Sequence, residues 1–203
     1  MNRSSQGIHK SNWSSNPGIS RRRWISAALT LLAVGAGRIA RVAATDNPRS
    51  MEAPEVLLES FKSDGTSLGT KRMSKVVKSD AEWRRQLPEE SFTVTRHAGT
   101  ERAFTGQYAN HHKTGIYACI CCDTALFDSA TKYESGTGWP SFWAPISKLN
   151  IKENVDRTLF LTRTSVECRR CDAHLGHVFN DGPNPTGLRY CMNSVSLKFI
   201  PRA

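Results

Sequence analysis

GIYACICCDTALFD, residues 115–128, places two short apolar runs on either side of a cysteine cluster. The same pattern continues downstream, where short apolar runs alternate with the turn residues Gly, Pro, Asn and Asp. These runs are GWPSFW, RTLFLTRTSV, GHVFNDG and RYCMNSVSLKFI. Short apolar segments separated by turn residues are typical of antiparallel strands. The chain beyond His97 is therefore predicted to be a mainly β domain.

Upstream of that region the sequence predicts a hairpin and two short helical segments. EVLLESF, KSDG and TSLGTKRM, over residues 55–73, are typical of two strands joined by an Asp-Gly turn. Ser79 and Glu82 form a Ser-x-x-Glu capping box, so a helix should begin there and end at Pro88. PEESF, residues 88–92, predicts the start of a second helical turn.

The charge of the chain is unevenly distributed. Of its 28 basic residues, seven lie in residues 1–45, where there is no acidic residue; the remaining 21 face all 18 acidic residues. Beyond residue 45 the positive and negative charges nearly cancel, so this part of the chain has no strong electrostatic attraction for nucleic acid. We therefore expect no nucleic-acid partner. At 203 residues, the chain is long enough for one domain with an appendage.

The basic appendage, residues 1–44, is typical of a targeting segment. Its apolar run, from Trp24 to Ala36, is shorter than the ~20 residues that span a bilayer, so we expect no stable membrane insertion after its removal. SRRRWI, residues 20–25, resembles a bacterial twin-arginine export signal, with Trp24 where Phe is usual, and predicts a periplasmic protein. An organelle transit peptide is the alternative, because such peptides are also rich in Arg and Ser.

Two Cys-x-x-Cys pairs predict a metal site. Cys119 and Cys122 form the first pair, and Cys168 and Cys171 form the second. Each pair supplies two thiolates from one tight turn, so two turns can complete the tetrahedral shell of Zn²⁺. A complete shell leaves no open position, so the zinc would be structural, one per chain.

Three alternatives remain open for these cysteines. The pairs could form disulfides in an exported protein, or one pair could be a redox dithiol. Cys168, Cys171, His174 and His177 could form one ligand set, although that block is more compact than the usual finger, whose pairs lie ~12 residues apart. Cys121 is the odd thiol of its cluster and could be a small buried hydrophobe.

Cys191 stands alone in GLRYCMNSVSLKF, residues 187–199. If this stretch is one strand, Arg189, Cys191 and Asn193 share a face, which continues with apolar side chains (Val195, Leu197 and Phe199). Arg189 would lie ~7 Å from Cys191, where its charge favours thiolate over thiol. Asn193 could donate a hydrogen bond or position a water. The alternative is an inert buried cysteine between an exposed Arg and a turn Asn.

CDAHLGHVFNDGP, residues 171–183, adds His174, His177 and Asp181 just after the second cysteine pair. Together with a lone cysteine, these are the groups that thiolate chemistry with proton delivery requires. GTGWPSFW, residues 136–143, adds aromatic surface beside a Gly-rich turn. There are two alternative hypotheses for the function. One is a zinc-bearing binding module without catalytic activity, and the other is a thiol–disulfide oxidoreductase that uses CRRC as its redox pair.

Three stretches resemble the signatures of the B-type methionine sulfoxide reductases. They are GTERAFTGQYANHHKTGIYACICCDTALFDSATKYESGTGWPSFW, CRRCDAHLGHVFNDGP and GLRYCMNSVSL, in that order. The resemblance implies a fold of two antiparallel β-sheets with short N-terminal helices and a four-cysteine zinc site. It divides the chain into a targeting segment (1–44), a polar extension with the hairpin (45–75) and a catalytic domain (76–200).

The resemblance also implies an activity and its residues. The family reduces the R epimer of methionine sulfoxide, chiefly in oxidised proteins, and so repairs them. Cys191 matches its nucleophile, which becomes a sulfenic acid. His174 and His177 match the histidines that bind and protonate the sulfoxide oxygen. Trp139 matches the aromatic wall that takes the substrate methyl, and Phe179 matches a second substrate-binding position.

Other matched residues support that reaction. Asp181, Arg189 and Asn193 match the residues that orient the network and favour the thiolate. The matched ligands of the structural Zn²⁺ are Cys119, Cys122, Cys168 and Cys171.

One position departs from the family pattern. Many members carry a resolving cysteine two residues before the pocket Trp, where this chain has Thr137. Either an external thiol reductant, thioredoxin-like or glutaredoxin-like, or Cys121 must therefore resolve the Cys191 sulfenic acid. Because Cys121 lies inside a metal-binding turn, we predict that it is not the resolving thiol.

Overall fold

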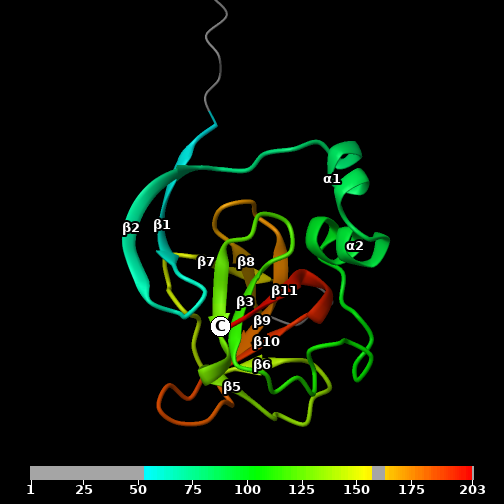
Figure 1. The fold of residues 1–203 in the computed structure, drawn as a ribbon. Helices are drawn as coiled ribbons and strands as arrows, with labels where there is room; N and C mark the ends of the chain where they lie inside the picture. Colours follow the sequence, from blue (N-terminus) through cyan, green and yellow to red (C-terminus); the bar gives the residue numbers. More distant parts are fainter. Residues whose placement is uncertain (1–52, 157–162, 203) are drawn as a thin grey trace, which may run out of the picture. The chain divides into compact units, whose positions relative to one another are not determined.

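The computed structural model describes residues 53–156 and 163–202 (Figure 1). The predicted targeting segment, 1–44, and the first part of RTLFLTRTSV, 157–162, lie outside these residues. Strands β1 (Glu55–Phe61) and β2 (Ser67–Ser74) form an antiparallel hairpin. Gly65 has a φ of 86°, and the Asp64 side chain accepts a hydrogen bond from the N–H of Thr66 at 2.8 Å. The predicted Asp-Gly hairpin is confirmed.

Two short helices follow, α1 (Asp80–Gln86) and α2 (Glu89–His97). Ser79 caps α1 through the predicted box: its N–H donates to Glu82 Oε2 at 2.8 Å, and its hydroxyl accepts from the N–H of Glu82 at 3.4 Å. The second helix is longer than the single turn predicted, because its apolar face, including Phe92, is buried in the core. No helix in the described residues is long and apolar enough to cross a membrane.

The rest of the domain is two antiparallel sheets, which confirms the predicted mainly β fold. One sheet has six strands in the order β5-β6-β10-β9-β8-β7, and the other has three in the order β11-β3-β4. The strands are β3 (Gly115–Cys119), β4 (Ala125–Asp128), β5 (Lys132–Tyr133), β6 (Ser141–Phe142), β7 (Ile151–Asp156), β8 (Arg163–Cys168), β9 (His174–Phe179), β10 (Arg189–Met192) and β11 (Leu197–Pro201). Single 3₁₀ turns are η1 (Ser129–Thr131) and η2 (Ser194–Ser196).

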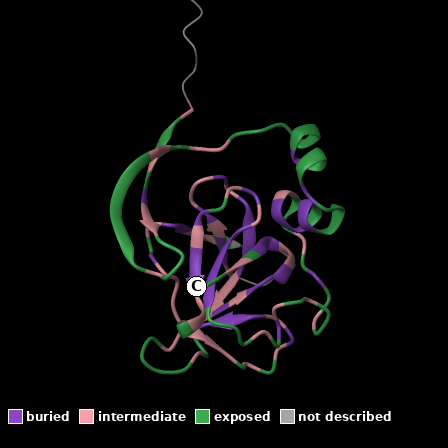
Figure 2. Cartoon of the chain, in the orientation of Figure 1, coloured by how far each residue is buried: buried purple, intermediate pink, exposed green. Residues whose placement is uncertain are grey.

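Aromatic side chains join the two sheets. Phe127 on β4 stacks on Phe142 of β6 with ring centroids 4.5 Å apart, and Tyr117 of β3 meets the same ring edge-on at 5.1 Å. All three rings are fully buried, and Trp83 of α1 is 1% exposed. Figure 2 shows the buried residues gathered in the sheets, whereas β2 and the outer side of α1 are exposed. Burial of these large rings is the main source of stability for such short strands.

The predicted single strand over residues 189–199 is wrong. Strand β10 ends at Met192, the chain turns through η2, and β11 pairs with β3 in the other sheet. The break has a local cause: the Ser196 hydroxyl and N–H both donate to the carbonyl oxygen of Asn193, at 2.7 and 3.1 Å. Side-chain bonds to the backbone compete with a strand ladder, so the polar residues here turn the chain between sheets.

The hairpin belongs to the same compact unit as the two sheets. Asn150, fully buried before β7, fastens it. Its Oδ1 accepts from the N–H of Glu59 at 2.9 Å, and its Nδ2 donates to the carbonyl oxygens of Glu59 and Ala125 at 2.9 and 2.8 Å. One amide thus ties the hairpin to β4.

We predict that Asn150→Ala lowers the free energy of unfolding by about 2 kcal/mol, because it strands buried backbone groups. Urea unfolding of the metal-loaded protein measures this change. Asn154→Ala, four residues further on in β7 and half-buried, should change it by less than about 0.5 kcal/mol. Equal effects of the two variants would show that Asn150 does not fasten the hairpin.

Candidate active site and metal centre

Cys191 lies in the middle of the six-stranded sheet. Strand β10 pairs with β9, which places Cys191 opposite His177, and with β6, which places it opposite Ser141. Its neighbours Tyr190 and Met192 are fully buried, whereas Cys191 is half-buried. The alternation of a strand therefore turns the thiol away from the core and toward a pocket.

A pocket of about 160 Å³ opens at this face of the sheet. It brings together five of the predicted residues: Cys191, His177, Asn193, Trp139 and Phe179. Four further lining residues were not predicted: two are neighbours of His177 and Cys191 along the chain, and two come from other segments. They are Thr100, Arg163, Gly176 and Met192. Two aromatic walls with a few polar groups are the usual composition of a small-ligand site.

Arg189 lies beside the pocket in a rigid setting. Its Nε and Nη2 donate to the two carboxylate oxygens of Asp181 at 2.8 and 2.7 Å, and its guanidinium carbon lies 4.3 Å from the centroid of the Phe179 ring. The hydrogen bonds with Asp181 raise the pKa of Arg189, and the nearby charge of Cys191 acts in the same direction. The same hydrogen bonds lower the pKa of Asp181. A permanent positive charge is thus held near the thiol.

The two histidines lie ring against ring on β9. Their centroids are 5.3 Å apart in an edge-to-face arrangement. Residues three apart on a regular strand point to opposite faces, but the register of β8 and β9 shifts where Gly176 and His174 pair with consecutive residues of β8. The extra residue brings His174 behind His177. His177 lines the pocket, and His174 is only 6% exposed.

Asn193 is a brace in the wall of the pocket. Its Nδ2 donates to the carbonyl oxygen of Leu175 at 3.0 Å, and its Oδ1 accepts from the N–H of Glu101 at 3.0 Å. Because both ends of this buried amide bind backbone, it fixes the turn after β10 to β9. The sequence predicted that this amide would donate a hydrogen bond or position a water, and it donates to a backbone carbonyl oxygen.

Hydroxyl groups surround the other side of the thiol. Thr137 Oγ1 lies 3.7 Å from the Cys191 sulfur, within the reach of a hydrogen bond to sulfur. Ser135 Oγ lies 2.8 Å from Thr137 Oγ1 and 2.7 Å from Ser141 Oγ. The position where many family members carry a resolving cysteine therefore contacts the nucleophile position here through a hydroxyl. The sequence identified Thr137 as the residue at the resolving position, but it did not predict the contacts of Ser135 and Ser141.

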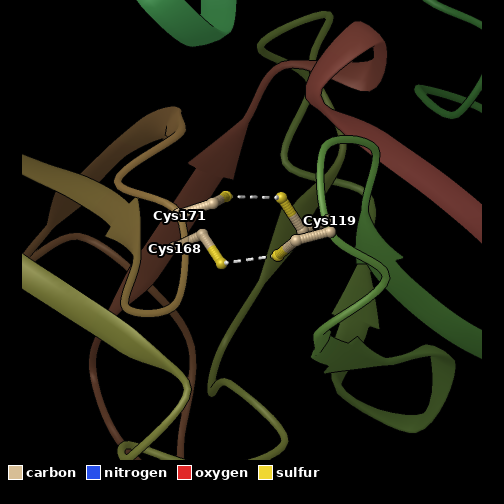
Figure 3. A group of neighbouring side chains, drawn as sticks. Cys119, Cys168 and Cys171 are labelled. Carbon is tan, nitrogen blue, oxygen red and sulfur yellow. Dashed lines mark hydrogen bonds between the residues drawn. The ribbon is translucent and has the colours of Figure 1, made fainter. Parts of the chain in front are cut away.

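The four paired cysteines gather at one point, as predicted. The sulfur atoms of Cys119, Cys122, Cys168 and Cys171 all lie within 4.8 Å of one another. Cys119 faces Cys171 at 3.6 Å and Cys122 faces Cys168 at 3.5 Å, without a disulfide (Figure 3). Tetrahedral Zn–S bonds of about 2.3 Å imply sulfur–sulfur distances of about 3.8 Å, so the cluster fits a metal ion of this kind. It includes neither His174 nor His177, so the mixed Cys/His ligand set is wrong.

The same turn is built twice around this centre. The N–H of Asp123 donates to the carbonyl of Cys119, and the N–H of Asp172 donates to that of Cys168, each at 2.9 Å. Both aspartates have a left-handed backbone, with φ of 59° and 55°. Hydrogen bonds with neighbouring thiols, Cys121 first, and burial raise the pKa of Cys119. A bound cation would offset the free-energy cost of burying the thiolate form.

Cys121 lies beside the cluster of four cysteines. Its side chain is 3% exposed and contacts Cys119, Cys171 and Thr95. The backbone carbonyl of Cys121 accepts a hydrogen bond from Gln86 Nε2 at 3.1 Å, which holds the turn against α1. Cys191, in contrast, lines the pocket.

Comparisons with known proteins show which family the chain belongs to. Residues 87–201 match the SelR domain. The chain is 58% identical over 125 residues to the peptide methionine sulfoxide reductase MsrB of Herminiimonas arsenicoxydans, which covers 62% of this chain and 91% of that protein. It is 55% identical over 130 residues to MsrB of Pseudomonas aeruginosa, which covers 64% of this chain and 98% of that protein. The chain therefore belongs to the SelR-domain family of which these reductases are members.

Proposed function

We propose that the chain is a peptide-methionine (R)-S-oxide reductase that repairs oxidised proteins through the Cys191 thiol. The single observation that carries this proposal is the position of Cys191 in a pocket walled by Trp139 and Phe179 and flanked by His177. The identity to MsrB proteins supplies the substrate, and the pocket supplies a place for it. A side chain ending in a methyl sulfoxide is small enough to enter from an oxidised protein.

In the proposed first step, the substrate methyl packs on the Trp139 indole and the sulfoxide oxygen faces His177. The Cys191 thiolate attacks the sulfur atom of the sulfoxide. The attack forms a sulfur–sulfur bond while His177, with His174 packed behind it to hold the ring, protonates the sulfoxide oxygen, which leaves as water. Water then attacks the Cys191 sulfur and breaks the sulfur–sulfur bond, so that methionine is released and Cys191 is left as a sulfenic acid.

Arg189 is proposed to stabilise the thiolate through its charge. Asp181 holds the guanidinium in place by two hydrogen bonds, and Phe179 packs on its face. Thr137 adds a hydroxyl that can donate to the sulfur. A fixed positive charge and a donor both favour the anionic nucleophile.

The sulfenic acid is proposed to be resolved by an external thiol, because Thr137 occupies the resolving position and Cys121 lies in the metal cluster. The incoming thiol bonds to the Cys191 sulfur, and the hydroxyl leaves as water. A second thiol then releases Cys191 by disulfide exchange. A thioredoxin-like or glutaredoxin-like dithiol protein supplies both electrons.

The metal ion is proposed to be a structural Zn²⁺ held by the four paired cysteines. A four-thiolate shell is closed, so the ion would supply stability and no open coordination position. Cys119 ends β3 in one sheet and Cys168 ends β8 in the other. The ion would therefore crosslink the two sheets.

Residues 1–44 are proposed to export the protein to the periplasm by the twin-arginine route. The arginines of SRRRWI, the short apolar run and the absence of acidic residues from this segment support the proposal. That route carries folded proteins, which suits a chain that binds its metal before export.

We predict that the reduced protein, without added reductant, converts about one equivalent of a peptide carrying the R sulfoxide to methionine, with little conversion of the S epimer. Cys191→Ser should lower the yield at least about 1000-fold, because it removes the nucleophile. Chromatography of the peptide measures both. A metal-loaded wild-type protein that converts neither epimer would leave a binding module as the better account.

Thiol counting in the same experiment tests the resolving step. We predict the loss of about one thiol per chain and the same result in Cys121→Ser, because the sulfenic acid persists until an external thiol arrives. Loss of two thiols, with a Cys121–Cys191 disulfide in the peptide map, would contradict external resolution.

Removal of one metal ligand should destabilise the fold. We predict about one zinc ion per chain in the wild type and its loss in Cys168→Ser, with a melting temperature at least about 10 °C lower. Cys121→Ser is the matched control from the same cluster and should retain both. Elemental analysis and thermal unfolding measure these effects. Full stability of a zinc-free Cys168→Ser protein would refute the structural role.

Fusion of residues 1–50 to a reporter that folds before export tests the leader. We predict that replacing Arg21 and Arg22 together by Lys leaves the reporter in the cytoplasm of a bacterial host, because the signal depends on the arginine pair. Arg3→Lys, outside the motif, should leave export unchanged. Export that is indifferent to the pair would exclude the twin-arginine route.

A further inference from the structure

Glu101 is a buried carboxylate beside the pocket that the proposed chemistry does not use. It is 3% exposed. Its Oε1 accepts from the N–H of Ser194 at 2.7 Å, and its Oε2 accepts from the N–H of Val195 at 3.0 Å. These are the first N–H groups of η2, where the chain leaves β10 just after Cys191. The carboxylate therefore fixes the turn that ends the nucleophile's strand.

The backbone of Glu101 binds two residues of the pocket wall. Its N–H donates to Asn193 Oδ1 at 3.0 Å, and its carbonyl oxygen accepts from the Trp139 indole Nε1 at 3.2 Å. The preceding residue, Thr100, also lines the pocket. One residue thus connects the Trp139 wall to the strand that carries Cys191.

A carboxylate suits this place because it has one acceptor oxygen for each of the two N–H groups. Burial raises the pKa of Glu101, and the two backbone N–H groups act in the opposite direction. A Gln side chain has one acceptor oxygen and one NH₂ group, which would oppose one of the two donors. Space is also limited: a Cβ on Gly106 would lie 2.5 Å from Glu101 Oε1 and 2.3 Å from Ser194 Oγ. The carboxylate is enclosed on that side.

We propose that Glu101 is a positioning residue that sets the separation between the Trp139 wall and Cys191, and through it the discrimination between sulfoxide epimers. The inference rests on the proposed function. The two epimers differ by exchange of the methyl group and the oxygen around sulfur. A pocket can distinguish them only if the wall that receives the methyl stays fixed relative to the nucleophile and to His177. The backbone beside Trp139 is already joined to β10 by the pairing of β6 with β10 and by the Met192 N–H, which donates to the Pro140 carbonyl oxygen at 3.0 Å. Glu101 adds the bond that holds the Trp139 indole itself to the turn after Cys191.

The test compares Glu101→Gln with Glu82→Gln, using peptides that carry the R or the S sulfoxide. Glu82 is the control because its carboxylate also accepts a backbone hydrogen bond at the start of a helix, from the N–H of Ser79, but in α1 and at the exposed surface. For Glu101→Gln we expect kcat/KM for the R peptide to fall at least about tenfold and the R-to-S ratio to fall with it, with zinc content unchanged. Glu82→Gln should keep both rates.

Gly106→Ala provides a second variant that retains the carboxylate. Its added methyl must displace Glu101 or Ser194, so we expect the R-to-S ratio to fall here as well. If Glu101→Gln or Gly106→Ala is folded and zinc-loaded and keeps the wild-type ratio, the inference is overturned and the proposed function stands. If the wild type reduces neither epimer, the proposed function is overturned, and the inference falls with it.

Discussion

The meeting of four cysteine sulfur atoms within 4.8 Å is the constraint on which the rest of this structure depends. The strands are short and the two sheets share a small aromatic core, and the sulfur cluster brings the end of β3 in one sheet to the end of β8 in the other. Strand β9 starts three residues beyond Cys171. The turn that carries Cys168 and Cys171 therefore also sets the start of the strand that carries both histidines.

The proposed function assigns stability and chemistry to different thiols of the same chain. The sulfur atoms of the four clustered cysteines, and of Cys121 beside them, are buried or in contact with another cysteine sulfur. Cys191 alone faces the pocket, with a fixed guanidinium near one side and a hydroxyl at the other. A closed thiolate shell suppresses thiol reactivity, whereas a half-buried thiol beside a positive charge is activated. The environment thus decides which sulfur can react.

Local signals in the sequence predicted local structure well. The Asp64-Gly65 turn and the Ser79 cap were predictable because their hydrogen bonds join residues two or three positions apart. The break after Met192 was missed because alternation of side chains describes a strand but not its end. That end depends on the local bond from the Ser196 hydroxyl to the Asn193 carbonyl oxygen and on the carboxylate of Glu101, which is distant in the chain.

The sequence by itself determined the chemical groups: the paired cysteines, the lone Cys191, the histidines that follow the second pair, and the threonine at the resolving position. Only the tertiary structure decided which atoms of these groups meet. It places His174 behind His177, directs both ends of the Asn193 amide to backbone, and links Trp139 to the nucleophile's strand through Glu101. The physical reason is that residue type and spacing specify what a side chain can donate or accept. Partners far apart in the chain are chosen by packing and by the demand of buried polar groups for hydrogen bonds.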